Sequence, residues 1–227
     1  MSLDSTPNTL SNGYKLVQAF LDIERLNKLQ NDIAPELFVA GRGGIRHADK
    51  KILAVAQLAQ SRLVMDAVHL FLGPGAQLSR AIVFNKTQLN NWQVGWHQDK
   101  TVAVAQKFAA PGWHTWSVKE RVHHVQPPLS VLDNIITLRV HLDDCLRENG
   151  CLQVIAKSHK KGILSDSNIK KCVASSKVFY CEAMAGDLLL MRPHILHASA
   201  KAQQVGLRRR VHLEYCAQVL PSGINWA

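Results

Sequence analysis

The sequence predicts a mainly β (α+β) fold, in which an antiparallel sandwich or barrel carries helices on its outside. Two observations lead to this prediction. Apolar residues recur at helical spacing up to the break at Gly73-Pro74-Gly75. Beyond that break the chain of 227 residues changes to short β-rich runs separated by turn residues, with no helical pattern between them.

Two amphipathic helices are expected in the N-terminal part, over residues 15–33 and about 49–71. The expected strands cover residues 81–86, 92–98, 102–105, 135–142, 151–156, 187–191 and 211–217. Segments 107–134 and 157–181 have no assigned element, and loops of this length are usually functional lids or mobile insertions. We therefore expect a single domain over 1–227, with a helical part at about 12–75 and a β core at about 80–218.

The composition narrows the class of partner. Lysine and arginine total 27 against 17 aspartate and glutamate, so the net charge is +10 and the surface should attract nucleic acid, phosphates or carboxylates. The basic residues are scattered, however, with no strip in which aromatic residues alternate with them, which argues against nucleic acid. The most apolar window, 52–64, is interrupted by polar residues and predicts no membrane span. A small-molecule substrate is the expectation that remains.

Cysteine usage and the N-terminus indicate the compartment. The five cysteines are an odd number without a C-x-x-C pair, which fits a reduced interior better than a disulfide framework or a zinc finger. The first fourteen residues are polar and lack the basic and apolar regions of a secretory signal. We therefore expect a cytoplasmic protein.

The candidate metal site begins with His97 and Asp99. On a strand, residues two apart project from the same face, so these side chains can bind one ion. An H-x-D triplet alone is more often a buried histidine held by a carboxylate. A second histidine, His197, follows an apolar run 100 residues after His97. Two histidines and one carboxylate form the facial triad of non-haem Fe(II) oxygenases, which leaves one face of the metal open.

Arg208 stands eleven residues after His197. In a simple hairpin the two residues would lie opposite or nearly opposite each other on neighbouring strands, because the midpoint between them falls in a polar turn. The arginine would then suit a two-pronged salt bridge with a carboxylate on whatever molecule chelates the metal.

Nearby histidines and arginines have plainer interpretations. His194 competes with His197 for the metal, but the two face opposite sides of an extended strand, and only His197 has an arginine eleven residues further on. Arg209 points away from Arg208 and is expected to be solvated. His141 is expected to be a hydrogen-bonded core histidine, although its position on an inner strand face would also allow it to line a pocket.

Taken together, these motifs resemble the phytanoyl-CoA dioxygenase family of Fe(II)- and 2-oxoglutarate-dependent oxygenases. The resemblance covers most of the chain and rests on NGYKLV at 12–17, the strand at 80–86, WHQD at 96–99, TLRVHLDD at 137–144, ENGCL at 148–152, SHK at 158–160, GD at 186–187 and the stretch at 197–208. It implies a double-stranded β-helix, or cupin-like jelly roll, with N-terminal buttressing helices. One departure is Ala156-Lys157-Ser158-His159, where the family usually has a Pro-Gly-Ser-His turn.

The resemblance also implies roles for individual residues. His97, Asp99 and His197 would bind Fe(II), and Arg208 would bind the distal carboxylate of 2-oxoglutarate with assistance from Ser199. Asp99 is informative because halogenating relatives lack a carboxylate at this position to make room for chloride. Its presence favours oxygen insertion.

Five further residues are candidates for the surroundings of the site. Gln98 and Lys86 are expected near the cosubstrate. Trp113 and Trp116 follow the H-x-D triplet and are candidate walls of a substrate pocket, and Arg139 lies on an expected inner strand face.

The function expected from these residues is hydroxylation of an unactivated C–H bond of a small metabolite, anionic or carrier-linked. The reaction would consume O2 and 2-oxoglutarate and release succinate and CO2. Two alternatives stay open: a cupin-like metal enzyme that does not use 2-oxoglutarate, and a basic protein that binds or demethylates nucleic acid.

Overall fold

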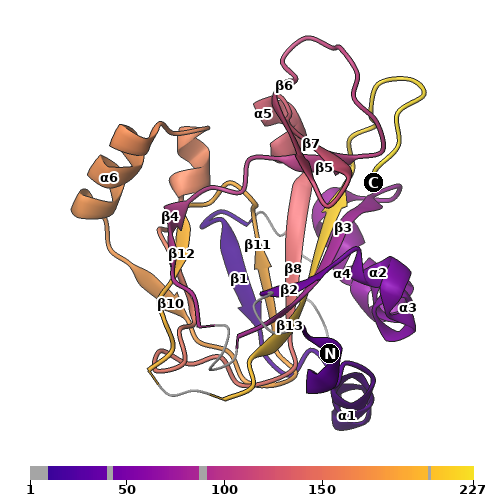
Figure 1. Cartoon of the computed structure of the whole chain (residues 1–227). Helices are drawn as coiled ribbons and strands as arrows, with labels where there is room; N and C mark the ends of the chain where they lie inside the picture. Colours follow the sequence, from indigo (N-terminus) through magenta and orange to yellow (C-terminus); the bar gives the residue numbers. More distant parts are fainter. Residues whose placement is uncertain (1–9, 40–42, 87–90, 204–205) are drawn as a thin grey trace.

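The computed structural model describes residues 10–39, 43–86, 91–203 and 206–227. Residues 1–9, part of the polar N-terminal segment assessed above, lie outside this range. The described strands form three sheets, and two of these face each other in the manner of a jelly roll (Figure 1). Among the described residues, no helix combines the length and the apolar character needed to span a membrane.

The larger sheet has six strands in the order β1-β11-β8-β13-β3-β2, and every pair is antiparallel. The bounds are β1 (Tyr14–Val17), β11 (Leu188–Met191), β8 (Ile135–His141), β13 (Arg209–Cys216), β3 (Gln77–Asn85) and β2 (Gly44–Arg46). Val211 pairs with Val140 on one side and Val83 on the other, and all three belong to the main apolar core. The alternate residues, among them Arg139 and His212, therefore project from the opposite face, toward the second sheet.

Helices cover the apolar face of this sheet (Figure 1). They are α1 (Ile23–Asp32), α2 (Ala48–Lys51), α3 (Leu53–Gln60) and α4 (Arg62–Leu72), and the short 3₁₀ turn η1 (Pro35–Leu37) follows α1. The side chain of Asp22 accepts a hydrogen bond from the amide of Arg25, which caps the start of α1. Gly73, at φ 76°, ends α4 where the sequence predicts a stop.

The two expected helices differ from those in the structure. The prediction of a helix from residue 15 is wrong at its start, because Leu16 pairs with Leu189 in a strand and the helix begins only at Ile23. Apolar positions alone did not reveal this long-range pairing. The second expected helix is divided into three, because Ile52 (φ −130°, ψ 108°) and Ser61 (φ −64°, ψ 146°) are extended. Ser61 instead caps α4 by accepting a hydrogen bond from the amide of Val64 at 3.4 Å.

The second sheet has four strands in the order β10-β9-β12-β4. They are β10 (Phe179–Cys181), β9 (Leu152–Val154), β12 (His197–Ser199) and β4 (Val94–His97). At one end of the space between the two sheets, the side chains form an apolar cluster that includes Val154, Leu189 and Met191. On the inner face of β8 and β13, buried polar side chains follow, so a functional site is expected there: Thr137, Arg139, His141, Arg210, His212 and Glu214.

The segments without assigned elements are largely structured. Segment 107–134 contains β6 (His114–Lys119), β7 (Val122–Gln126) and α5 (Leu129–Leu132), and β5 (Val102–Val104) joins β6 and β7 in the order β5-β7-β6. Glu120 and Arg121 connect β6 to β7 with φ values of 49° and 65°. Asparagine or glycine usually marks such a turn, and neither residue is present at these two positions, so no hairpin was predicted.

Segment 157–181 contains the 3₁₀ turn η2 (Ser158–Lys161), helix α6 (Asp166–Ser175) and β10. The side chain of Ser165 caps α6 by accepting a hydrogen bond from the amide of Asn168 at 3.3 Å. Cys172 is the buried residue of this helix, so its apolar stripe is too short to produce a clear helical pattern.

Candidate metal centre

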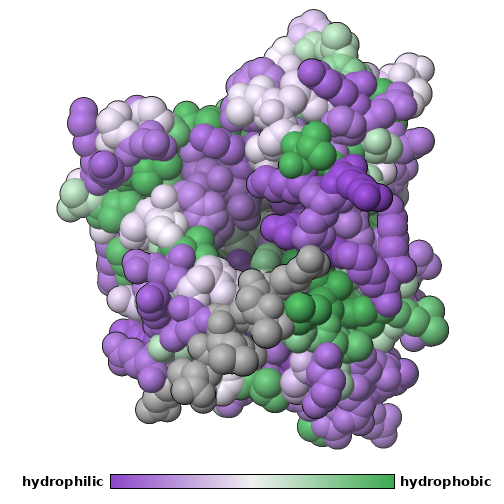
Figure 2. All heavy atoms as spheres, viewed as in Figure 1, coloured by the Kyte–Doolittle hydropathy of each residue, from purple (hydrophilic) through white to green (hydrophobic). Residues whose placement is uncertain are grey.

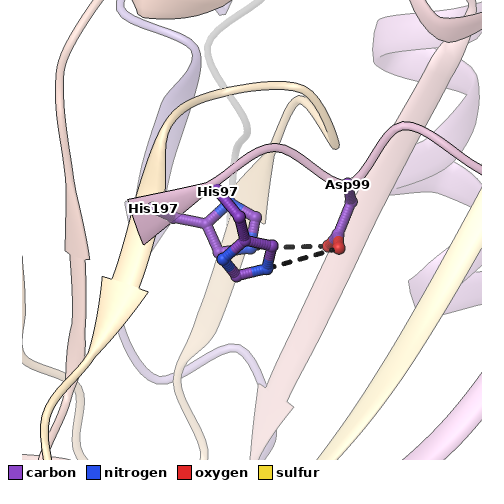
Figure 3. Close-up of side chains that lie close together, drawn as sticks. All are labelled: His97, Asp99 and His197. Carbon is purple, nitrogen blue, oxygen red and sulfur yellow. Dashed lines mark ion pairs between the residues drawn. The ribbon is translucent and has the colours of Figure 1, made fainter. Parts of the chain in front are cut away.

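Three side chains meet at the edge of the smaller sheet. His97 is the last residue of β4, Asp99 follows two residues later, and His197 opens β12 directly opposite His97 in the ladder. One ligand atom from each lies within 4.8 Å of the other two. Figure 3 shows both imidazole rings turned toward the carboxylate, with Nε2–Oδ distances of 3.6 Å for His97 and 3.5 Å for His197. The three residues thus offer three donors to one ion.

Backbone contacts fix which ring nitrogen each histidine presents. Nδ1 of His97 lies 2.8 Å from the carbonyl oxygen of Gly95, and Nδ1 of His197 lies 2.8 Å from that of Ile195. A carbonyl oxygen can only accept, so Nδ1 carries the proton in both rings. Nε2 is then left with its lone pair facing the metal position, the arrangement in which imidazole is a ligand.

The charges of the three groups support one another. Burial alone would raise the pKa of Asp99, but the neighbouring His197 and His97 outweigh it and hold this pKa well below its ordinary value. Burial would likewise lower the pKa of His97, yet the neighbouring Asp99 carboxylate raises it. The amide of Asp99 donates to the carbonyl of Pro193 at 3.0 Å, which anchors the loop that carries the carboxylate. Asp99 is therefore ionised and held in place as a ligand.

His194 lies in a different cluster. Its Nε2 is 3.2 Å from Oδ1 of Asp133, and its ring centroid is 6.0 Å from that of His159. The side chain is completely buried. Of the two histidines that compete in sequence, the structure brings only His197 to His97 and Asp99.

Arg208 is buried and reaches the site by a route that the sequence did not suggest. The expectation of a simple hairpin between His197 and Arg208 is wrong, because β12 belongs to the smaller sheet and β13, which Arg208 precedes, belongs to the larger. Instead, the carbonyl of Gly150 links β12 to Arg208. It accepts hydrogen bonds from Oγ of Ser199, at 2.8 Å, and from Nη1 of Arg208. Ser199 and Arg208 are therefore joined through one backbone oxygen.

Gly150 is required at this position. Its φ of +78° suits glycine, and a Cβ atom built there would lie 2.4 Å from the carbonyl oxygen of Ala200. Nζ of Lys86 donates to the same Ala200 oxygen and lies 5.7 Å from the centre of the Trp92 ring. Burial, together with the charges of Arg208 and another arginine, lowers the pKa of Lys86 to about 8.

A sequence model of the family described as Phytanoyl-CoA dioxygenase (PhyH) matches residues 10–210, a range that includes His97, Asp99, His197 and Arg208. The chain belongs to the phytanoyl-CoA dioxygenase family. Enzymes of this family depend on Fe(II), 2-oxoglutarate and O2, and the donor set described above suits that metal. Comparison with curated protein sequences gives no significant match.

Solved structures share the fold of this phytanoyl-CoA dioxygenase family member at low sequence identity. EctD from S. alaskensis with bound Fe is 16% identical with a TM-score of 0.70, and the match covers 96% of this chain and 79% of that one. HygX from Streptomyces hygroscopicus with nickel and 2-oxoglutarate bound is 14% identical with a TM-score of 0.69, covering 92% and 84%. SnoN, a non-heme alpha ketoglutarate dependent epimerase from nogalamycin biosynthesis, is 14% identical with a TM-score of 0.67, covering 95% and 81%. The jelly-roll fold is thereby confirmed.

Three other residues that were expected near the site lie in different surroundings. The Gln98 amide is engaged by backbone, since Nε2 donates to the carbonyls of His194 (2.7 Å) and Gly162 (2.8 Å) and Oε1 accepts from the amide of Leu164 (2.8 Å). It therefore secures the segment before α6. Trp113 and Trp116 pack their rings against Phe108, at centroid distances of 4.9 and 5.3 Å, in the apolar cluster that includes β5.

Two expectations about polar residues of the larger sheet need correction. Arg209 is buried rather than solvated, because it forms an ion pair with Asp143 at 2.8 Å and donates to the carbonyls of Gln30 and Ile33. His141 is buried as expected, but among the described residues its Nδ1 has no hydrogen-bond partner. Burial and the nearby arginines lower its pKa to about 3.

Arg210 is a further candidate site residue, and it was not predicted from the sequence. It is buried on the inner face of the larger sheet, two residues after Arg208. The strand parity that pointed from His97 to Asp99 would have pointed from Arg208 to Arg210 as well.

Proposed function

We propose that this member of the phytanoyl-CoA dioxygenase family hydroxylates an unactivated C–H bond of a small metabolite, using Fe(II), 2-oxoglutarate and O2 and releasing succinate and CO2. The observation that carries this proposal is the juxtaposition of three metal ligands with a buried arginine. His97, Asp99 and His197 offer their donors within 4.8 Å of one another, and Arg208 is linked to the same sheet through the Gly150 carbonyl.

Each residue has a distinct task in this reaction. His97, Asp99 and His197 would hold the metal, which supplies the oxidising chemistry when O2 and the 2-oxo acid are present. Arg208 would form the salt bridge to the distal carboxylate of 2-oxoglutarate, and Ser199 fixes the Gly150 carbonyl that orients the guanidinium. Arg208 Nε has no hydrogen-bond partner among the described residues, so a donor is free for an incoming carboxylate.

Asp99 supports oxygen insertion rather than halogenation, because the third protein ligand occupies the position that chloride would need. The chain's contribution to the chemistry is to hold both histidines in one tautomer, to keep the carboxylate ionised and to bind the cosubstrate in a fixed direction. We place the reaction in the cytoplasm, since all five cysteines are free thiols.

The main alternative is a cupin-like metal enzyme that does not use 2-oxoglutarate. An arginine buried inside the barrel with a free donor argues against it, because such a charge is costly to bury without an anion. Nucleic acid as substrate finds no support in the arrangement of the basic residues.

The test is a titration of the anaerobic, Fe(II)-loaded protein with 2-oxoglutarate by calorimetry, followed by measurement of succinate formed in air. We expect binding, and slow succinate formation even without substrate. The His197→Ala variant is the control for adventitious iron. Absence of both binding and consumption in the wild-type protein overturns the proposal.

A further inference from the structure

Two arginines besides Arg208 project from the inner face of the larger sheet. Arg139 lies on β8 opposite His212, and Arg210 lies on β13 opposite His141. The two residues therefore occupy successive same-face rungs of one antiparallel ladder. Figure 2 shows a hollow between the two sheets, with hydrophilic residues along much of its border.

Within the described part of the chain, neither arginine forms an ion pair with an acidic side chain. Arg139 and Arg210 are each 6% exposed, and among the described residues their Nε atoms have no hydrogen-bond partner and neither guanidinium joins an ion pair. Other arginines of the same sheet differ. Arg209 pairs with Asp143 at 2.8 Å, and Arg80 pairs with Glu214 at 3.3 Å. In the described ranges, Arg80 and Arg209 are therefore paired with carboxylates, whereas Arg139 and Arg210 are not.

The positive charges of Arg139, Arg208 and Arg210 repel one another. Burial lowers the pKa of Arg210, and the charges of Arg139 and Arg208 lower it further. The pKa of Arg139 is lowered by burial and by Arg208, while Asp99 acts in the opposite direction, which places Arg139 within electrostatic reach of the metal centre. Burying unpaired cations is unfavourable, so an anion that enters the barrel would be bound strongly.

The cosubstrate does not supply enough negative charge. The charges of Fe(II) and Arg208 would be matched by Asp99 and the two carboxylates of 2-oxoglutarate. Arg139 and Arg210 would still lack an anion, and Lys86 is a further cation near Arg210. The guanidinium of Arg210 also stacks on the ring of Phe84, at 4.9 Å, which holds it ready in one orientation.

We propose that Arg139 and Arg210 form a second anion-binding site, which recognises a carboxylate or phosphate group on the substrate. This inference rests on the proposed function, because it places the substrate next to 2-oxoglutarate in one barrel. A guanidinium offers two parallel donors to either anion, so the pair selects acidic metabolites over neutral ones and directs the rest of the substrate toward the metal.

The experiment measures anion binding with three probes: inorganic phosphate, acetate and neutral acetamide. Each is titrated by calorimetry into the Ni(II)-loaded protein, with and without saturating 2-oxoglutarate. We expect phosphate or acetate to bind in the presence of 2-oxoglutarate and acetamide not to bind. The stronger of the two anions identifies the group that the substrate carries.

Arg139→Gln and Arg210→Gln should each lower the affinity for that anion about ten-fold or more, while changing the affinity for 2-oxoglutarate by less than about three-fold. Lys170→Gln, on the exposed side of α6, is the surface-charge control and should change neither. Arg139→Lys keeps the charge without the two-pronged geometry and should have intermediate anion affinity. It also provides a variant with an unchanged charge if a glutamine variant does not fold.

Two results overturn the inference. One is equal anion binding by the wild-type protein and both glutamine variants. The other is a loss of 2-oxoglutarate affinity in Arg139→Gln as large as that in Arg208→Gln, which would assign the arginines to the cosubstrate. Failure of the proposed function is distinguishable, because 2-oxoglutarate would then not bind the wild-type protein while phosphate or acetate still could.

Discussion

His97 and His197 face each other across the β4–β12 ladder, with ring centroids 4.2 Å apart. A single antiparallel pair thus supplies two of the three metal ligands, and Asp99 completes the set two residues beyond the end of β4. The register of these two strands therefore determines whether the site exists, because a slip by one residue would turn one imidazole to the opposite face of the sheet.

The first prediction compares two histidines three residues apart. His197→Asn should lower the affinity for Fe(II) or Ni(II) by more than about a hundred-fold, since loss of a direct ligand exceeds the effect typical of outer-shell partners. His194→Asn should leave metal affinity nearly unchanged and lower the thermal midpoint, because this side chain is buried beside Asp133. Anaerobic metal titration and thermal unfolding measure the two effects. Equal metal affinity in both variants would contradict the assignment.

A second prediction uses adjacent arginines. Arg208→Gln should weaken 2-oxoglutarate binding by at least about 2 kcal/mol, or roughly thirty-fold, because a charge-assisted pair is lost. Arg209→Lys keeps its charge but disturbs the buried ion pair with Asp143, so it should lower stability and leave cosubstrate affinity within about three-fold. Calorimetry and thermal unfolding separate these outcomes. If both variants lose affinity to the same degree, Arg208 has no direct role.

The third prediction concerns pH. Burial and the charges of Arg208 and Arg210 lower the pKa of Lys86 to about 8, with the Cys145 thiol acting in the opposite direction. Lys86 is charged below this value and neutral above it, so 2-oxoglutarate affinity should fall as the pH rises through about 8. A bound anion raises the pKa of Lys86, and binding near pH 8 should take up protons.

Calorimetry in two buffers with different ionisation enthalpies measures that proton uptake. Lys86→Met keeps an unbranched aliphatic side chain and removes the charge near the Trp92 ring, so its affinity should be lower and should not change between pH 7 and 9. Persistence of the wild-type pH profile in this variant would show that another group titrates.

The fourth prediction concerns stability in acid. His141 has a folded-state pKa of about 3, lowered by burial and then by Arg139 and Arg210, against an ordinary value of 6.5. The unfolded chain therefore binds a proton that the folded chain does not, and stability falls as the pH drops below 6.5. One such histidine contributes a loss of about 2 kcal/mol between pH 6.5 and 5.

His141→Gln should have a flatter dependence of unfolding free energy on pH over that interval, measured by denaturant titration. Part of the slope should remain, because burial also lowers the pKa of His124 to about 4. Identical slopes for the wild-type protein and the variant would show that folding does not lower the pKa of His141.

A local pattern related His97 to Asp99 because they lie two positions apart, whereas the contact of His197 with them depends on the long-range pairing of β12 with β4. Strand parity alone relates His97 to Asp99, and it needs no knowledge of the rest of the chain. The same reasoning failed for Arg209, whose partners Gln30 and Ile33 come from the far end of α1 and leave no trace near residue 209. A charged residue followed by other charged residues resembles a surface strand until such partners are known.

The fold class was predicted for a similar reason, and the boundaries of its parts were not. Turn residues and β-rich runs marked β3, β4, β8, β9, β11 and β13, but β2, β10 and β12 were not predicted. β1 was hidden in a helical pattern because its pairing with β11 spans most of the chain. The hairpin of β6 and β7 was missed because Glu120 and Arg121 adopt left-handed backbone angles without the residues that usually signal them.

The carbonyl of Gly150 connects the two facing sheets of the barrel beside the metal centre. It is held by Ser199 from the sheet that carries the metal ligands and by Arg208 from the facing sheet. The spacing between the metal position and the guanidinium therefore depends on the connection between β8 and β9, residues 142–151, which carries this carbonyl. We expect that spacing to select the cosubstrate by its length, so that a diacid one carbon shorter or longer could not reach both ends at once.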